Sequence, residues 1–185
     1  MLFLLFQLGN DRYALEAGRV VEVLPLVELK GLPQSPPGVA GVFNYRGQPV
    51  PAVDLCALTL QRPAQECLST RIIVVRCPGA ELKDNGAPSN GERGTGNGEP
   101  GTGKAVPRSA FEGSEFGRGH LLGLIAEQAT ETLRRNRQDF VNAGLKLDRA
   151  PYLGPVLLDP QGMIQWIHED RLLPGPVREA LFTQL

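Results

Sequence analysis

Cysteine and histidine are scarce in this sequence, which has three cysteines and two histidines in 185 residues. The spacing of Cys56, Cys67 and Cys77 matches neither a CxxC metal clip nor a disulfide framework. No HxH, HxxxH or HExxH pattern joins His120 to His168. These absences argue against a metal hydrolase and against a disulfide-stabilised secreted domain. We expect free thiols, no metal site and no cofactor.

Excess charge, abundant aromatic residues and long apolar runs are missing as well. Nineteen Lys and Arg residues face 20 Asp and Glu residues, and aromatics make up 6% of the chain. Binding to nucleic acid normally needs a basic surface, and single-strand binding also needs exposed aromatic rings, so both are disfavoured. The early apolar run from Leu2 to Phe6 is too short for a secretory signal or a membrane span. We expect a soluble, intracellular protein.

Glycine and proline concentrate in one stretch, residues 78–119, which holds 11 of the 22 glycines. Such a composition buries too little apolar surface to offset the entropy of ordering the chain. We therefore predict one domain over residues 1–185 that is interrupted by a disordered insert at about 78–119. An insert in a hairpin loop is tolerated because loop-closure entropy grows only with the logarithm of loop length.

The remaining sequence predicts a mainly β fold of short strands rich in Val, Leu and Ile. Turn residues in "DPQG" join the last two strands into a hairpin. Helices are expected only after Asp54, which is placed as an N-cap, and in the tail, where Pro176 suits a first helical position. This pattern is typical of one or two small barrels. The predicted strands cover 2–8, 20–29, 41–45, 49–55, 71–77, 120–131, 151–158 and 163–168.

One hairpin, residues 38–55 with the sequence "GVAGVFNYRGQPVPAVDL", is especially informative. Pro49 and Pro51 both lack an N–H on the same strand edge, so that edge cannot join a regular ladder. Gly47 supplies the positive φ that a tight turn needs. Arg46 beside it is then either part of a solvated hairpin tip or an arginine held out to meet a partner.

Several segments in order resemble the CheW domain family, whose members couple chemoreceptors to the histidine kinase CheA. The most specific element is the Gly-Val-x-Asn-x-Arg-Gly core at 41–47, followed by a proline and an Asp-Leu. Two departures stand out: Glu127 replaces the usual aspartate, and the linker at 78–119 is a short turn in the family. The similar segments are "FQLGNDRYALEAGRVVEVLPLVEL" (6–29), "LPQSPPGVAGVFNYRGQPVPAVDL" (32–55), "RIIVVR" (71–76), "HLLGLIAEQATETL" (120–133) and "YLGPVLLDPQGMIQWIHEDRLL" (152–173).

The resemblance implies two intertwined five-stranded SH3-like barrels and a non-enzymatic adaptor with no catalytic residues. By position in the family motif, Val20, Glu22, Gly41 and Arg46 align at or near a receptor-binding groove. Arg46 is expected either to bind receptor oxygens or to brace the hairpin from inside. The resemblance assigns no kinase-binding residues.

The implied partners are the cytoplasmic tip of a methyl-accepting chemoreceptor and the regulatory domain of a CheA-type kinase, with no nucleic acid and no membrane insertion. The implied location is the cytoplasm, at membrane-bound receptor clusters. Two alternatives remain: a scaffold of a surface-sensing, Wsp-type pathway, which the long insert suggests, or a ligand-binding β-barrel module. An enzyme using Cys56 or Cys77 is disfavoured, because apolar surroundings raise the pKa of a thiol.

Overall fold

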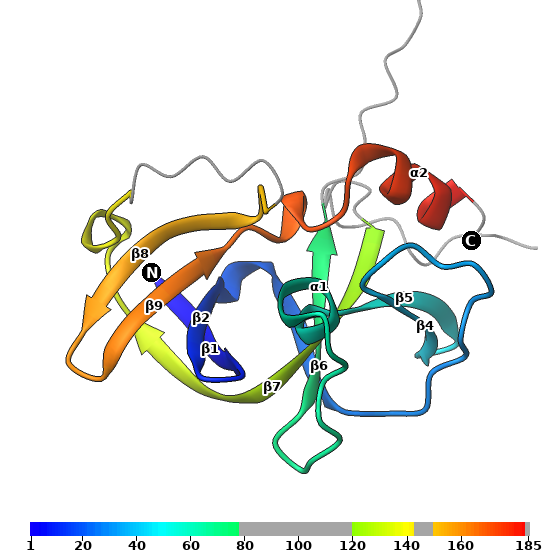
Figure 1. The fold of residues 1–185 in the computed structure, drawn as a ribbon, viewed down its shortest axis with the longest axis horizontal. Coiled ribbons are helices and arrows are strands. Elements are labelled where there is room, and N and C mark those ends of the chain that lie inside the picture. The colour runs from blue at the N-terminus through cyan, green and yellow to red at the C-terminus, as the bar shows by residue number, and fades with distance from the viewer. Residues whose placement is uncertain (78–119, 143–149, 184–185) are drawn as a thin grey trace, which may run out of the picture.

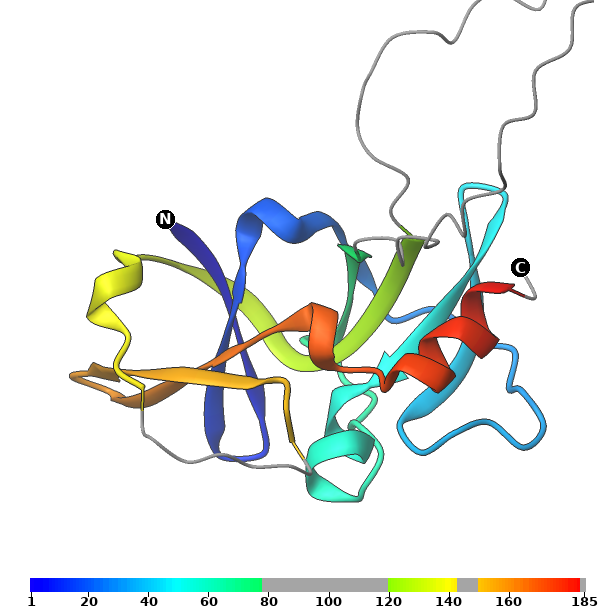
Figure 2. The ribbon, with the colours of Figure 1, turned by 90° about the horizontal axis from the view of Figure 1, so that it is seen from above.

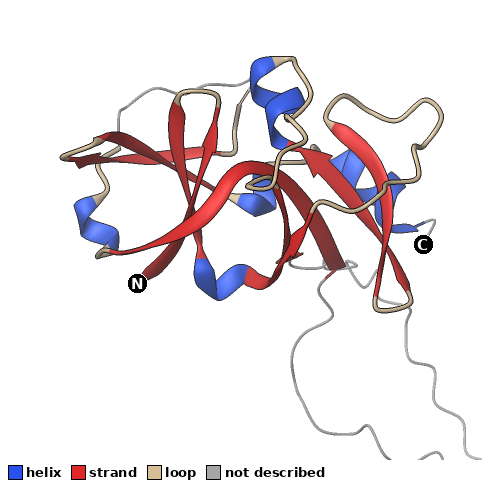
Figure 3. Ribbon diagram, turned by 90° about the horizontal axis from the view of Figure 1, so that it is seen from below, coloured by secondary structure: helices blue, strands red, loops and turns tan. Residues whose placement is uncertain are grey.

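The computed structural model describes residues 1–77, 120–142 and 150–183. The predicted insert at 78–119 lies outside the described residues. Nine strands dominate these residues, and the helices among them are short (Figures 1 and 3). In chain order the strands and α-helices are β1 (Leu2–Leu8), β2 (Asp11–Glu16), β3 (Val20–Pro25), β4 (Val39–Tyr45), β5 (Gln48–Asp54), α1 (Leu55–Leu60), β6 (Arg71–Cys77), β7 (His120–Arg134), β8 (Leu153–Asp159), β9 (Gly162–Ile167) and α2 (Gly175–Thr183).

The first barrel, lobe 1, contains β3, β4, β5, β6 and the first half of β7. Strand β6 pairs with both β3 and β7, and β7 also pairs with β5 in parallel. The β4–β5 hairpin meets the segment after β3, where the N–H of each of Lys30 and Val42 donates to the carbonyl of the other. This isolated bridge links β4, at one end of the strand order in lobe 1, to the segment that follows β3, at the other end.

The second barrel, lobe 2, contains β1, β2, β8, β9 and the second half of β7. Strand β1 pairs with β7 and β2, and β2 pairs in parallel with β9, which forms the predicted hairpin with β8. Val141, which follows β7 in the chain, exchanges two backbone hydrogen bonds of 2.8 Å with Val156 of β8. The two lobes together confirm the mainly β fold and the pair of intertwined five-stranded barrels.

Strand β7 belongs to both lobes and runs from one to the other (Figure 2). Its residues up to Ala126 pair with β6, and its residues from Glu127 onward pair with β1. Within the β1-paired part the register shifts between Glu127 and Glu131, and Gln128 in that stretch has a φ of 46°. A bulge with a left-handed residue bends a strand locally. The bend therefore marks the crossing point of the two lobes.

The core has one apolar cluster inside each lobe and a larger one between the lobes. On β1, Phe3 and Leu5 face the interior of lobe 2, while Leu4, Phe6 and Leu8 face the cluster between the lobes. Strand β6 likewise alternates between the interior of lobe 1 and the shared cluster. A strand buried on both faces needs an uninterrupted apolar sequence, which explains the run at the start of the chain.

The strand predictions were incomplete in two places. Strand β2 was not predicted, because its burial does not alternate: Tyr13, Ala14 and Leu15 are buried in succession between charged residues. The strand predicted over 20–29 ends at Pro25, where its pairing with β6 stops. The two predicted helices are present, and α2 packs against lobe 1 through the stacked rings of Phe182 and His120.

Candidate functional site

The turn of the β4–β5 hairpin holds an arginine in a left-handed backbone conformation. Arg46 has a φ of 52° and Gly47 a φ of 85°, as a two-residue type I′ hairpin turn requires. The Asn44 Oδ1 accepts a hydrogen bond of 2.8 Å from the Gly47 N–H. A non-glycine residue at such a φ is unfavourable by itself, so the flanking strands must hold it there. The predicted tight turn is confirmed.

The Arg46 side chain forms a polar cluster with Glu22 and Tyr45, called the Arg46 cluster below. The Glu22 Oε2 accepts a hydrogen bond of 2.8 Å from Arg46 Nη2 and one of 2.7 Å from the Tyr45 hydroxyl. The hydrogen bond to Glu22 raises the pKa of Tyr45. These contacts connect the β4–β5 hairpin to β3, the strand at the other end of the strand order in lobe 1.

The Arg46 side chain remains 74% exposed although its guanidinium is bonded to Glu22, whose side chain is 35% exposed. Its carbon lies 5.2 Å from the centroid of the Tyr45 ring. The sequence left open whether Arg46 braces the hairpin or faces a partner. The structure shows that it makes a bracing ion pair from the outside and still presents most of its surface to solvent.

Gly41, at the other end of β4, has a structural reason to be glycine. Its φ is 148°, and a Cβ built there would lie 2.4 Å from the carbonyl oxygen of Lys30. Strand β4 approaches that backbone to form the bridge between Lys30 and Val42. Gly41 therefore permits the contact that brings the ends of lobe 1 together, and its predicted role at the receptor groove stays a prediction.

Val20, the fourth predicted residue, begins β3, two positions before Glu22. It is partly buried against the cluster between the lobes, whereas Val21 and Val23 are exposed. Glu22 and Arg46 thus meet directly and Val20 lies on the same strand as Glu22. Gly41 lies apart from them along β4.

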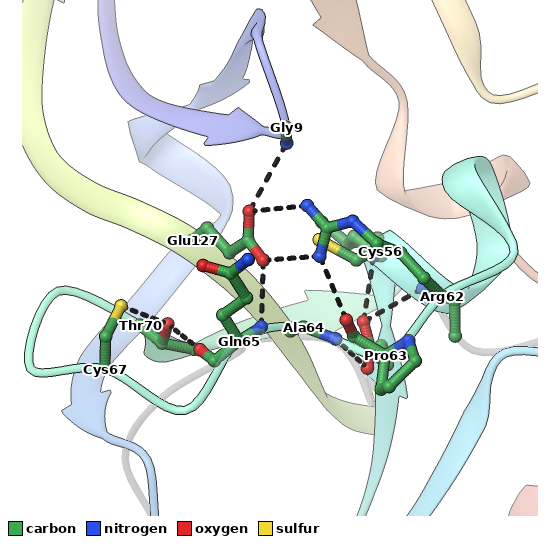
Figure 4. Close-up of polar contacts among 12 residues, drawn as sticks. Gly9, Cys56, Arg62, Pro63, Ala64, Gln65, Cys67, Thr70 and Glu127 are labelled. Atoms are coloured by element: carbon green, nitrogen blue, oxygen red, sulfur yellow. Dashed lines mark hydrogen bonds and ion pairs between the residues drawn. The ribbon is translucent and has the colours of Figure 1, made fainter.

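A second polar cluster, around Glu127, was noticed in the sequence only as a departure from the family pattern (Figure 4). Its Oε1 accepts hydrogen bonds of 2.8 Å from Arg62 Nη1 and from the Gln65 N–H. Its Oε2 accepts bonds from Arg62 Nη2 at 3.2 Å and from the Gly9 N–H at 3.3 Å. These four residues are called the Glu127 clasp below.

The Glu127 carboxylate is charged and nearly buried, with 9% of the side chain exposed. The hydrogen bonds from Arg62 lower its pKa to about 2, against the opposing effect of burial, and the amides of Gln65 and Gly9 contribute in the same direction. A buried charge is tolerated when it is paired and fully hydrogen-bonded. No local sequence signal reveals this cluster, because its members are distant along the chain.

Asp54 has the helix-capping role predicted for it. Its Oδ1 accepts from the N–H groups of Cys56 and Ala57 at the start of α1. Its Oδ2 accepts from the Ala64 N–H at 2.8 Å, which fixes the segment between α1 and β6 as well. The hairpin prolines also behave as predicted, because β5 pairs with β7 only from Ala52, beyond Pro51.

The three cysteines are free thiols, as predicted, but they differ chemically. Burial raises the pKa of Cys56 to about 12 and that of Cys77 to about 11, which weakens both as nucleophiles. Hydrogen bonds from Ser69 and Thr70 lower the pKa of the exposed Cys67 to about 7. The raised pKa values of Cys56 and Cys77 agree with the effect expected from their apolar surroundings in the sequence, whereas the lowered pKa of Cys67 was not predicted. Within the described ranges, no three His, Cys, Asp or Glu side chains gather in a way that suits a metal ion.

No helix among the described residues has the length and apolar character needed to cross a membrane.

Comparison with known proteins gave two findings. Residues 2–83 match the model of the CheW-like domain family. The fold is similar to the crystal structure of the scaffolding protein TtCheW from Thermoanaerobacter tengcongensis, with a TM-score of 0.65, 18% identity, and coverage of 94% of this chain and 87% of that one. No curated protein matches the sequence. The resemblance to CheW-like proteins seen in the sequence is confirmed.

Proposed function

We propose that this CheW-like chain is a non-enzymatic adaptor that joins the cytoplasmic tip of a methyl-accepting chemoreceptor to the regulatory domain of a CheA-type kinase. The observation that carries the proposal is the Arg46 cluster, in which a tight turn presents an arginine whose side chain is largely exposed. The match to the CheW-like domain and the fold shared with a scaffolding protein support it.

The Arg46 cluster suits the binding of a receptor tip because it presents a positive charge with unused hydrogen-bond donors. Arg46 uses Nη2 for Glu22, so the remaining N–H groups of the exposed fork can donate to carboxylate or carbonyl oxygens of a partner. Because Glu22 already fixes the arginine, little side-chain entropy remains to be lost on binding.

The kinase is expected on a different surface, in a contact of barrel against barrel. Our proposal assigns no individual residues to that contact. It places the protein in the cytoplasm, recruited to membrane-bound receptor clusters. A scaffold of a surface-sensing, Wsp-type pathway is the same kind of adaptor with a different output, so the two are distinguished by the partners that co-purify from the native cell.

Binding of the 185-residue chain to each of the two partners, measured separately, tests the proposal. We expect Arg46→Ala to weaken binding to a receptor-tip fragment about tenfold or more, because a charge-assisted hydrogen bond contributes roughly 1.5–3 kcal/mol. Binding to the kinase regulatory domain should be unchanged. Arg171→Ala is the matched control, since Arg171 is also an exposed, ion-paired arginine. Equal receptor affinity for Arg46→Ala and wild type would remove Arg46 from the receptor site.

A further inference from the structure

The crossing point of the two lobes carries a polar connection that the proposed function does not use. The turn at Gly9 joins β1 to β2 in lobe 2, whereas Arg62 and Gln65 belong to the segment that leads from α1 into β6 of lobe 1. Glu127, on the strand shared by both lobes, accepts hydrogen bonds from all three residues (Figure 4). A single carboxylate thus connects both barrels at their junction.

The β7 backbone is bent beside Glu127, so the carboxylate lies where the strand changes direction. Gln128 is in the left-handed region with a φ of 46°, and the pairing with β1 jumps from Leu5 opposite Glu131 to Gln7 opposite Glu127. Bulges redirect strands and the side chains near them. The clasp therefore bridges the place where β7 changes from one barrel to the other.

The lobe 1 side of the clasp is itself held firmly. The N–H groups of Ala64 and Gln65, adjacent in sequence, donate to different carboxylates, those of Asp54 and Glu127, each at 2.8 Å. Arg62 adds a two-pronged contact to Glu127 through Nη1 and Nη2. A bidentate arginine fixes direction as well as distance. Movement of lobe 1 relative to Gly9 would therefore lengthen either the 3.3 Å bond from the Gly9 N–H or the bonds that Glu127 accepts from Arg62 and Gln65.

We propose that the Glu127 clasp fixes the relative orientation of the two lobes and transmits binding at one lobe to the other. The second half rests on the proposed function, because it needs a receptor on one surface and a kinase on another. Allosteric coupling requires that each partner favours the same arrangement of an element shared by both sites. Glu127 is then a positioning residue, and it need not touch either partner.

Three variants separate charge, reach and fork geometry in the clasp. Glu127→Gln removes the charge and keeps the length, whereas Glu127→Asp keeps the charge and shortens the side chain by one methylene. Arg62→Lys keeps the charge and removes the bidentate fork. Glu131→Gln is the matched control, because Glu131 is an exposed glutamate on the same strand.

The first readout is the distance between the lobes in the free protein. Spin labels are placed at Glu28→Cys in lobe 1 and Gln161→Cys in lobe 2, both exposed positions, in a Cys67→Ser background. Pulsed electron paramagnetic resonance should give one narrow distance distribution for the unmodified clasp and for Glu131→Gln. The distribution should broaden in all three clasp variants, and the amides of Gly9 and Gln65 should exchange hydrogen at least tenfold faster.

The second readout is the effect of a saturating receptor-tip fragment on the affinity for the kinase domain. The clasp variants should bind each partner separately as the wild type does and lose the effect of one partner on the other. A distance distribution that stays narrow in Glu127→Asp and Arg62→Lys overturns the clasp, and so does coupling that survives a broadened distribution. If neither partner binds the unmodified chain, the proposed function and the coupling role fall together, while the interlobe distances still decide the clasp.

Discussion

Two arginine–glutamate pairs in this molecule have the same shortest N–O distance, 2.8 Å, and very different surroundings. In the Arg46 cluster, the arginine is 74% exposed and the glutamate 35% exposed. In the Glu127 clasp, the corresponding values are 37% and 9%, and two backbone amides also donate to the carboxylate. Exposed pairs contribute little to stability, whereas breaking a buried pair is costly. Distance alone therefore says little about what an ion pair does.

The comparison suggests a division of roles between the two clusters. The Arg46 cluster keeps a charged group accessible and correctly placed, which suits recognition of a partner. The Glu127 clasp keeps a charge away from solvent and satisfies both of its oxygens within the protein, which suits mechanical connection. Substitutions in the clasp should change stability, and substitutions in the Arg46 cluster should change binding.

The largest effect is expected for Arg62→Ala, which leaves the Glu127 carboxylate buried with only two amide donors. Loss of one partner of a fully buried pair costs about 3–5 kcal/mol. The Arg62 side chain is 37% exposed, so water can reach the carboxylate in its place, and we expect a loss of about 2–3 kcal/mol. Urea unfolding monitored by circular dichroism measures the change, with Arg46→Ala as the exposed counterpart. A loss below about 1 kcal/mol for Arg62→Ala would place both pairs in the same energetic class.

Acid should destabilise the protein through Glu127. The pKa of this group is about 2 in the folded state against an ordinary 4.5, so the unfolded chain binds the proton more readily between these values. The stabilisation, on the order of 3 kcal/mol, is fully present above about pH 5 and is lost as the pH falls toward 2. Urea unfolding at several pH values should show this loss in the wild type and a shallower dependence in Glu127→Gln. Identical slopes would contradict the assignment.

Gly41→Ala tests whether the backbone contact to Lys30, and not the Arg46 ion pair, holds the ends of lobe 1 together. The added Cβ would meet the Lys30 carbonyl and occupy an unfavourable φ, so we expect a loss of about 1–3 kcal/mol. Gly47→Ala is the control, because its φ is also positive but no atom lies within 4 Å of the added Cβ. Equal losses at both positions would show that φ alone, without the contact, sets the cost.

The smallest effect on stability is expected in the Arg46 cluster. Arg46→Ala and Glu22→Gln should each change the free energy of unfolding by less than about 1 kcal/mol, because the pair is exposed and screened by salt. Chemical denaturation of both variants alongside Arg62→Ala provides the direct comparison. A larger loss of unfolding free energy in Arg46→Ala would show that Arg46 contributes mainly to the stability of lobe 1 and not to partner binding.

Local chemistry made much of the fold predictable from the sequence. The apolar runs, the "DPQG" hairpin and the cap at Asp54 depend on neighbours within a few residues, and all three are confirmed. Strand β2 escaped prediction because it is buried between elements on both sides and shows no period-two pattern. Predictions from neighbouring residues cannot detect burial that is caused by segments distant in the sequence.

The two polar clusters show the same limit. Arg46 and Gly47 form a recognisable turn, and these residues predicted its tight geometry but left open whether Arg46 braces the hairpin or faces a partner. The partnership of Arg46 with Glu22 required the barrel, since the two stand on different strands. The clasp connects Glu127 to Gly9 and Arg62 across the junction of the lobes, so nothing near Glu127 in the sequence could indicate its contacts.

The adaptor function is tested most directly by sedimentation velocity of the purified chain mixed with a receptor-tip fragment and a kinase regulatory domain. We expect one species that contains all three components, which disappears for Arg46→Ala while the complex of chain and kinase domain persists. Binding of the two partners that is mutually exclusive, or binding of neither, would contradict a protein that holds a receptor and a kinase at the same time.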